Sequence, residues 1–227
     1  MLLFTSLSPS PSREQAQKDA ISTWRATGHV PVAVQHPSDD VSAYGEMNVV
    51  ILRTENTTPL GRKNYVRLDA ILKLANEICL GRIGIINADC ALTCGQNHIE
   101  TIADPKALSI FSRTDVDPDG ENPKVFPWGF DLFVMDPALM APLVPGSSMA
   151  LGLPWWDYML PMAAINNSIP VMRHDNILRH VRHEERYEYA GYLMQASAIE
   201  RALGIAHNSR HTILPIINHN TTLVHHD

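Results

Sequence analysis

An asparagine and an aspartate, Asn87 and Asp89, directly follow the short apolar run Ile83-Gly84-Ile85-Ile86. The run predicts a buried strand, and in an extended chain side chains two residues apart point the same way. The two side chains could therefore hold one oxygen-preferring cation at the carboxyl edge of a sheet, where open α/β sheets bind ligands. The alternative is that Asn87 and Asp89 only close the strand as turn residues.

Polar residues also end the three strands that we predict earlier in the chain, as the pairs Thr5-Ser6, Gln35-His36 and Arg53-Thr54. Together with Asn87 and Asp89, these pairs could line one crevice. A diphosphate bound there would need cationic partners. The candidates for that role are Arg13, Arg53, Arg62 and Lys63. The alternative is that these side chains lie on solvated loop surfaces.

Strands and helices alternate in the first half of the chain. We expect strands at 2–5, 30–34, 48–52 and 83–86. A first helix is expected to start at Ser12, with Gln15 completing a capping box, and to end at Gly28. A second helix is expected at 62–79, because apolar residues recur there at helical spacing: Tyr65, Leu68, Leu72, Ala75 and Cys79. This order predicts an α/β fold with a mostly parallel central sheet wrapped by helices.

The second half of the chain is less regular. Strands are expected at 107–112 and 130–135, separated by a loop rich in Asp and Pro. A short helix after Trp156 is expected to kink or end at Pro161. A short strand at 171–172 and a helix at about 184–203 complete the predicted elements. One domain is expected over 1–203, followed by a polar and peripheral tail at 204–227.

The order of these features resembles the GT-A glycosyltransferase fold of the nucleotide-diphospho-sugar transferase superfamily. In that family an Asp-x-Asp-type motif after a strand holds a divalent metal against the diphosphate of the sugar nucleotide. Asn87-Ala88-Asp89 is similar to this motif, with the first acid replaced by asparagine. One charge fewer weakens metal binding, although an amide oxygen can still ligate Mg²⁺ or Mn²⁺.

The resemblance covers about residues 2–190 and implies a Rossmann-type α/β/α sandwich. Residues 1–100 would then form the nucleotide-sugar half of the domain, and residues 101–203 the acceptor half. The donor-binding residues implied by the resemblance are Thr5, Ser6, Arg13, Gln35, Arg53, Asn87, Asp89 and Arg179.

In many inverting members of this family, a Gly-aromatic-acid segment places a carboxylate beside the acceptor, whose hydroxyl proton it removes. Asp157 occupies the matching position in the run Gly152-Leu153-Pro154-Trp155-Trp156-Asp157. Neighbouring aromatic rings would desolvate the carboxylate and raise its basicity, and Trp155 or Trp156 could stack on a sugar face. The alternative is that Asp157 is a helix-start residue and both tryptophans belong to the core.

In several GT-A families a histidine downstream of the acceptor region completes the metal shell or contacts the diphosphate. His180 and His183 are three residues apart and would share a face on a helical turn. Either could meet Asp89, with Arg179 or Arg182 neutralising phosphate, and the resemblance leaves open which histidine serves the site. The alternative is that both histidines are structural.

The resemblance also places Arg113 and Asp131 on the acceptor side, since both follow the metal motif in the chain. Asp131 opens an apolar strand and could bind acceptor hydroxyls. Service in the core or in a turn is the alternative for both residues.

Bulk composition limits the other possibilities. The net charge of -6 argues against a broad nucleic-acid surface. The three cysteines, Cys79, Cys90 and Cys94, lack zinc-type spacing and suit a reducing cytosol. Polar Thr5 and Ser6 interrupt the apolar start of the chain, so no signal peptide is expected. No run reaches the roughly 18 apolar residues of a membrane helix, and we expect a cytoplasmic protein.

The leading hypothesis is a glycosyltransferase that moves a sugar from a UDP- or GDP-type donor to a hydroxyl of a glycan or another acceptor, with inversion and with help from Mn²⁺ or Mg²⁺. One alternative keeps the fold without catalysis, as a nucleotide-sugar or glycan binding module. Another is a nucleotidyltransferase, which would need a Gly-rich basic loop after the first strand. The segment Ser6-Leu7-Ser8-Pro9-Ser10-Pro11 in that place counts against it.

Overall fold

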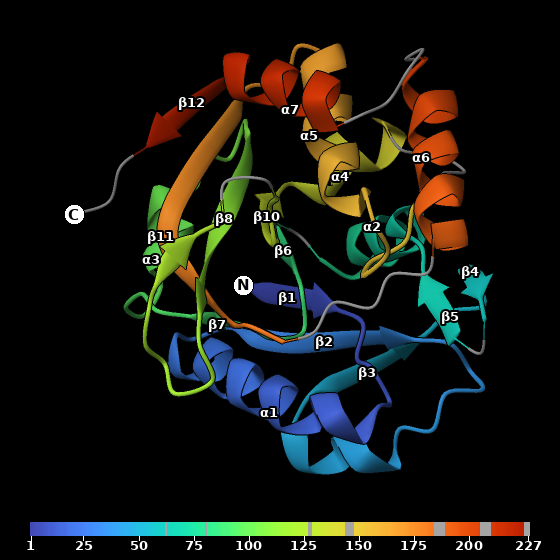
Figure 1. The fold of residues 1–227 in the computed structure, drawn as a ribbon, viewed down its shortest axis with the longest axis vertical. Coiled ribbons are helices and arrows are strands. Elements are labelled where there is room, and N and C mark those ends of the chain that lie inside the picture. Colours follow the sequence, from blue (N-terminus) through green and yellow to red (C-terminus); the bar gives the residue numbers. More distant parts are fainter. Residues whose placement is uncertain are drawn as a thin grey trace.

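A computed structural model describes residues 1–61, 63–79, 81–126, 129–143, 148–183, 189–204 and 210–224. Within these ranges one large sheet forms the centre of the molecule (Figure 1). Its strands in spatial order are β12 (Thr221–Val224), β11 (Val171–Val181), β8 (Leu108–Val116), β10 (Leu132–Met135), β6 (Ile83–Ile86), β1 (Leu2–Thr5), β2 (Val30–Gln35) and β3 (Val50–Arg53).

Neighbouring strands in this order are parallel, except that β10 is antiparallel to both β6 and β8. Two short strands add to it antiparallel, β7 (Cys90–Leu92) beside β11 and β9 (Lys124–Val125) beside β8. A separate hairpin consists of β4 (Thr57–Leu60) and β5 (Lys63–Val66). The mostly parallel α/β sheet expected from the sequence is confirmed.

Helices cover both faces of the sheet, because alternate residues of each strand point to opposite sides. Leu3 belongs to one buried cluster and its neighbour Phe4 to the other. On the side of Leu3 lie α1 (Pro11–Ala26), the 3₁₀ helix η1 (Ser42–Met47) and α3 (His98–Ile102). On the side of Phe4 lie α2 (Leu68–Ile78), α5 (Trp156–Asn166), α6 (Tyr189–Leu203) and α7 (Arg210–His219), as Figure 1 shows. The short α4 (Pro137–Met140) and η2 (Ala141–Leu143) precede α5 in the chain.

The strand before the candidate site is tightly enclosed. All four residues of β6 are buried, and a Cβ atom on Gly84 would overlap the side chain of Leu3. Only glycine therefore allows β1 and β6 to pack as they do. The strand β7, which follows β6 after a short turn, is tied to α1, since the indole N–H of Trp24 donates to the carbonyl of Cys90 at 2.8 Å.

The first half of the chain largely follows its local pattern. The strands expected at 2–5, 30–34 and 83–86 form within one residue of their predicted ends. The strand expected at 48–52 lies at Val50–Arg53. The first helix starts at Pro11 instead of Ser12, and Ser10 precedes it without a side-chain capping bond. Proline suits the first helical position, because that residue needs no N–H donor.

The helix predicted at 62–79 is wrong at its start. Residues 63–66 form β5, and the helix α2 begins at Leu68. Arg67 between them is extended, and the N–H of Leu68 donates to the carbonyl of Met149 at 2.9 Å. Hydrogen bonds to distant parts of the chain thus replace the first turn of the predicted helix. A local apolar pattern contains no information about such bonds.

The second half departs further from its local pattern. The helix α5 continues through Pro161, since residues 158–164 are all buried and packing offsets the lost backbone bond. Where a two-residue strand was expected, β11 runs over 11 residues. The predicted peripheral tail after Gly204 is wrong for residues 210–224, because α7 packs into the core and β12 pairs with β11. Residues 184–188 of the predicted last helix, and residues 205–209 and 225–227 of the predicted tail, lie outside the described residues.

Among the described residues, no helix has both the length and the apolar character needed to cross a lipid bilayer.

Candidate metal site and cavity at the carboxyl edge of the sheet

Four parallel strands, β1, β6, β8 and β11, run in the same direction and end at one edge of the sheet. The antiparallel β10 starts at this edge, directly after Asp131. Ligand sites of open α/β sheets lie at such an edge. Here the structure contains a cavity of about 340 Å³. It is lined by Ser6, Ser8, Arg13, Gln17, Leu60, Lys63, Tyr65, Asn87, Ala88, Asp89, Arg113, Gly152, Leu153, Pro154, His180, His183 and Gly191.

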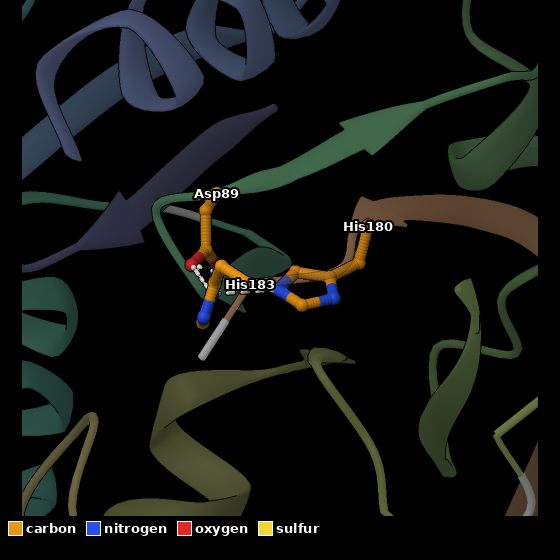
Figure 2. Close-up of side chains that lie close together, drawn as sticks. All are labelled: Asp89, His180 and His183. Carbon is orange, nitrogen blue, oxygen red and sulfur yellow. Dashed lines mark hydrogen bonds and ion pairs between the residues drawn. The ribbon is translucent and has the colours of Figure 1, made fainter. Parts of the chain in front are cut away.

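Asp89, His180 and His183 converge in this cavity, and we refer to them as the metal triad (Figure 2). The Nε2 atoms of the two histidines are 3.1 Å apart. Asp89 Oδ2 lies 3.2 Å from His183 Nε2 and 3.7 Å from His180 Nε2. Three potential ligand atoms therefore form a triangle with sides of 3.1, 3.2 and 3.7 Å.

A divalent metal fits this triangle. Ligand atoms about 2.1 Å from a metal are roughly 3.0 Å apart in octahedral and roughly 3.4 Å apart in tetrahedral geometry. The observed separations of 3.1 and 3.2 Å match these values, and the third, 3.7 Å, is slightly longer. Both ligand types, imidazole nitrogen and carboxylate oxygen, bind divalent transition metals. The metal triad thus has the chemistry and the size of one face of a coordination shell.

Each member of the metal triad is held by a different part of the fold. Asp89 lies in the turn between β6 and β7, where the N–H of Cys90 donates to the carbonyl of Asn87. His180 lies in β11 and is almost fully buried. His183 follows the end of β11, next to Arg182, whose guanidinium donates at 2.8 Å to both Asp117 Oδ1 and the Asn122 carbonyl.

The sequence predicts that the two histidines share one face of a helical turn, and this prediction is wrong. His180 belongs to a strand, and the chain leaves the sheet after Val181. Their ring centroids are nevertheless 4.8 Å apart, so both histidines take part in the cluster. Both histidines therefore lie close to Asp89.

The charges of the metal triad stabilise one another. Burial alone would lower the pKa of His180, but the hydrogen bond to Asp115 and the nearby Asp89 carboxylate outweigh it and raise this pKa to about 9. Burial alone would raise the pKa of Asp89, but the neighbouring imidazoles of His180 and His183 hold it well below its ordinary range. Without metal, His180 is therefore a cation at neutral pH beside the Asp89 carboxylate.

This ion pair makes the stability of the metal-free protein depend on pH. The pKa of His180 is about 9 in the folded protein and about 6.5 in the unfolded chain, so its stabilisation is complete below pH 6.5 and is lost as pH rises through 9. We expect the free energy of unfolding to fall by up to about 3 kcal/mol between these values, measured by urea denaturation in EDTA. The variant His180→Gln is expected to show a much smaller decrease. The same decrease in both proteins would show that another group causes it.

Seven residues proposed from the sequence line the cavity: Ser6, Arg13, Asn87, Asp89, Arg113, His180 and His183. Lys63, one of the cationic candidates, lines it as well. Arg62, another candidate, lies outside the described residues. The position of these residues is consistent with their predicted roles, which stay predictions.

Three residues predicted to bind the donor do not line the cavity, and each is hydrogen-bonded to a loop. The Oε1 of Gln35 accepts from Leu7 N at 2.9 Å and from Ser6 Oγ at 3.0 Å, so Gln35 shapes the loop after β1. Arg53 donates to the carbonyls of His36 and Asp39. Arg179 is exposed and donates to the Gly120 carbonyl at 3.1 Å. The remaining residue, Thr5, is fully buried in the sheet and does not line the cavity.

Four residues predicted around the acceptor do not line the cavity either: Asp131, Trp155, Trp156 and Asp157. The two tryptophans are 3% and 5% exposed and pack against aromatic rings of the core. They present no free face to a sugar, so we do not propose them as stacking residues. Asp131 is buried behind the cavity wall, where it pairs with Arg113.

Asp157 lies in the first turn of α5, three residues after Pro154 in the cavity wall. Its Oδ2 accepts a long hydrogen bond, 3.4 Å, from the N–H of Phe130. The carboxylate is half-buried, and its role as a base stays a prediction.

The hairpin of β4 and β5 supplies cavity residues that the sequence did not point to, Leu60 and Tyr65. The helical spacing of apolar residues predicts Tyr65 on the apolar face of a helix, and this prediction is wrong. The strand-forming pair Thr57-Thr58 and Gly61, whose φ of 60° suits a turn, are the signals that could have indicated a hairpin here. Gly191 of α6 closes the cavity beside Leu60, where a side chain would collide with it.

No protein-family model matches the sequence, and a comparison with curated protein sequences finds no match either. Solved structures do match. The mannosyltransferase PcManGT from Pyrobaculum calidifontis, in complex with GDP-Man and Mn²⁺, is 11% identical, with a TM-score of 0.56 over 96% of this chain and 67% of that chain. A mycobacterial protein is 10% identical, with a TM-score of 0.52 over 91% of this chain and 75% of its own.

A third structure, S. aureus TarS 1–349 in complex with UDP-GlcNAc, is 12% identical and has a TM-score of 0.49 over 95% of this chain and 70% of that chain. At such identities a structural match shows the fold alone. The chain has the fold of PcManGT, a GT-A-like α/β fold with a large mostly parallel sheet, as the order of its sequence motifs predicts.

Proposed function

We propose that the protein is a glycosyltransferase, which moves a sugar from a nucleotide-diphosphate donor to an acceptor hydroxyl. The observation that carries the proposal is that one cavity of a GT-A-like fold combines the metal triad with the cations Arg13 and Lys63. A sugar-nucleotide diphosphate calls for both, because a divalent metal and cationic side chains share its negative charge. A third cation of the lining, Arg113, is paired with Asp115 and Asp131.

Arg13 and Lys63 are the residues that we propose bind the diphosphate. Arg13 extends from the first turn of α1, and its Nη1 lies 3.5 Å from Asp89 Oδ2. The N-terminus of this helix adds a partial positive charge to the same wall. Burial lowers the pKa of Lys63, although the charge of Asp39 opposes this effect. A bound diphosphate would supply the anionic partner that compensates for burial of the ammonium group.

Asp89, His180 and His183 would hold the metal, which when bound would stabilise the negative charge of the departing nucleoside diphosphate. Two imidazoles and one carboxylate suit Mn²⁺ better than Mg²⁺, since Mg²⁺ prefers oxygen ligands. The complex of PcManGT with GDP-Man and Mn²⁺, in the same fold, supports the choice of a sugar nucleotide of the GDP type as donor and of manganese as the metal.

Asp157 is the residue that we propose removes the proton from the acceptor hydroxyl. The hydroxyl oxygen attacks the anomeric carbon, the bond from this carbon to the diphosphate oxygen breaks, and the configuration inverts. The position of Asp157 at the start of α5, just beyond the wall segment Gly152–Pro154, supports this role.

A non-catalytic binding module of the same fold was favoured only by Asn87, which carries one charge fewer than the expected acid. The Asn87 amide donates to Asp131, and the metal triad forms without it. Asn87 is therefore no argument against a functional metal site.

We expect purified protein to bind a UDP- or GDP-sugar at least about tenfold more tightly with Mn²⁺ than with EDTA, which is a difference of about 1.4 kcal/mol. Calorimetry with a panel of UDP- and GDP-sugars measures this. Release of nucleoside diphosphate in the presence of candidate acceptors measures transfer. Binding without turnover on any acceptor would support the binding module, and failure to bind any sugar nucleotide would refute the proposal.

A matched pair of lysine variants tests the diphosphate site. Lys63→Met is expected to weaken donor binding about tenfold or more, since it removes a partly buried cation from the cavity wall. Lys106→Met removes an equal charge from an exposed loop and is expected to leave binding unchanged. Equal effects of the two variants would indicate that only the overall charge matters.

A further inference from the structure

The pairing of β8 with β11 places an aspartate beside the buried histidine of the metal triad. Between His174 and Leu178 the register of this pair shifts by two residues, with Asn176 in the left-handed region at φ 66°. After the shift His180 lies directly opposite Asp115, and paired residues of parallel strands share one face of the sheet. Irregularities of this kind next to a site redirect side chains.

Asp115 is hydrogen-bonded to Nδ1 of His180, the ring nitrogen that faces away from Asp89 and His183. His180 Nδ1 lies 2.9 Å from Asp115 Oδ1, while His180 Nε2 faces His183 and Asp89. A histidine that donates its Nδ1 proton to a carboxylate keeps the lone pair of Nε2 free for a metal.

Asp115 is itself fixed by a chain of polar contacts that leads back to the strand of Asp89. Arg113 Nε donates to Asp115 Oδ1 at 2.8 Å, and Arg113 Nη1 lies 3.2 Å from Asp131 Oδ2. The other oxygen of Asp131 accepts from the Asn87 amide. We call these four residues, Asn87, Asp131, Arg113 and Asp115, the support network.

We propose that Asp115 is a positioning residue for the metal ligand His180, and that the support network couples the geometry of this ligand to the turn that carries Asp89. The proposal rests on the metal site of the proposed function. In this network Asn87 acts as a hydrogen-bond donor and not as a ligand. The departure from an Asp-x-Asp motif then has a physical reason, because an aspartate at position 87 would place a second carboxylate against Asp131.

Mn²⁺ titration followed by electron paramagnetic resonance tests the role of Asp115. Loss of a carboxylate behind a metal-bound histidine typically weakens metal binding about 10- to 100-fold. We expect losses in this range for Asp115→Ala and for Asp115→Asn, which keeps the shape of the side chain. Asp119→Asn, which neutralises an exposed carboxylate of the following loop, is the matched control and is expected to bind Mn²⁺ like wild type.

A nuclear magnetic resonance signature separates positioning from general structural damage. In protein loaded with diamagnetic Zn²⁺, the Nδ1 proton of His180 is expected to give a downfield signal protected from exchange with water. The signal should persist in Asp119→Asn and disappear in Asp115→Asn. A protected signal and an Mn²⁺ affinity within twofold of wild type in both Asp115 variants would overturn the proposal. If Asp115→Ala does not fold, Asp115→Asn decides alone.

Asn87→Asp gives an independent test, because the two roles of Asn87 predict opposite changes in Mn²⁺ affinity. If Asn87 were a weakened ligand, restoring the acid would tighten Mn²⁺ binding. The support network predicts the opposite, a loss of affinity of about tenfold, because the new carboxylate loses the contact with Asp131 and repels it. Tighter binding by this variant would overturn the proposal.

His183→Ala distinguishes failure of this proposal from failure of the proposed function. If Mn²⁺ binds wild type and His183→Ala equally well, or binds neither, the metal site itself is wrong. Both proposals are then refuted. If wild type binds Mn²⁺ through His183 but tolerates every Asp115 and Asn87 variant, the positioning role alone is wrong.

Discussion

Replacing Asp89 by alanine is expected to remove high-affinity Mn²⁺ binding and to slow sugar transfer by at least about 10³-fold. Asp89 is the only carboxylate of the metal triad, and its Oδ2 lies within 3.7 Å of both histidine nitrogens and 3.5 Å from Arg13 Nη1. Without it, two imidazoles face a guanidinium group, and a metal ion would meet net positive charge. A metal contributes several kcal/mol to stabilising a departing diphosphate, and about 1.4 kcal/mol corresponds to a tenfold change in rate.

Two further variants make the Asp89 test specific. Asp89→Asn keeps the size of the side chain and one ligating oxygen but loses the charge, so we expect an intermediate loss of Mn²⁺ affinity. Asp104→Ala removes an exposed carboxylate elsewhere and should match wild type. The measurements are Mn²⁺ titration and the rate of nucleoside diphosphate release, with circular dichroism to confirm folding. Wild-type turnover in folded Asp89→Ala would remove the metal triad from the mechanism.

Replacing Asp157 by asparagine is expected to lower kcat by about 10²- to 10⁴-fold while donor and Mn²⁺ binding stay unchanged. General-base catalysis contributes a factor of this size, and an amide cannot accept the proton of an acceptor hydroxyl. The substitution keeps an oxygen that can accept the hydrogen bond from the Phe130 N–H. Its effect should therefore fall on the chemical step and not on the fold.

The alternative role of Asp157, as a helix-start residue, predicts a different result. An aspartate in the first turn stabilises a helix by about 0.3–1 kcal/mol through the helix dipole. Asp69→Asn removes such a residue from the first turn of α2 and serves as the control. We expect small losses of thermal stability in both variants, the larger one in Asp69→Asn, which also loses an ion pair with Arg67. A loss of kcat is expected in Asp157→Asn alone. A kcat within threefold of wild type in Asp157→Asn would assign Asp157 to the helix start.

The parts of the fold that could be predicted are those in which a local pattern coincides with the final environment. The run 83–86 is apolar because β6 is buried on both faces, so its identity as a strand is visible in four residues. Asp89 could be placed at the carboxyl edge of the sheet because it directly follows this strand, and parallel strands end at that edge.

Other elements depend on contacts that a local pattern does not contain. Tyr65, Leu68 and Leu72 fit a helical spacing, yet Tyr65 lies in β5 because the chain pairs with β4 and bonds to the segment near Met149. The burial of Trp155 and Trp156 is likewise set by partners from distant elements, including Tyr192 and Phe133. The same residue types would serve equally well around a sugar.

The sequence by itself determined which ligand types are present and that Asp89 stands at the end of a buried strand. Only the tertiary structure decided that both histidines reach Asp89, and that Asn87 contacts Asp131. The physical reason is that spacing along the chain specifies distances within one strand or helix. Asp89 and His180 are 91 positions apart in the chain, and the distance between them is fixed only when β11 pairs with β8 in a particular register.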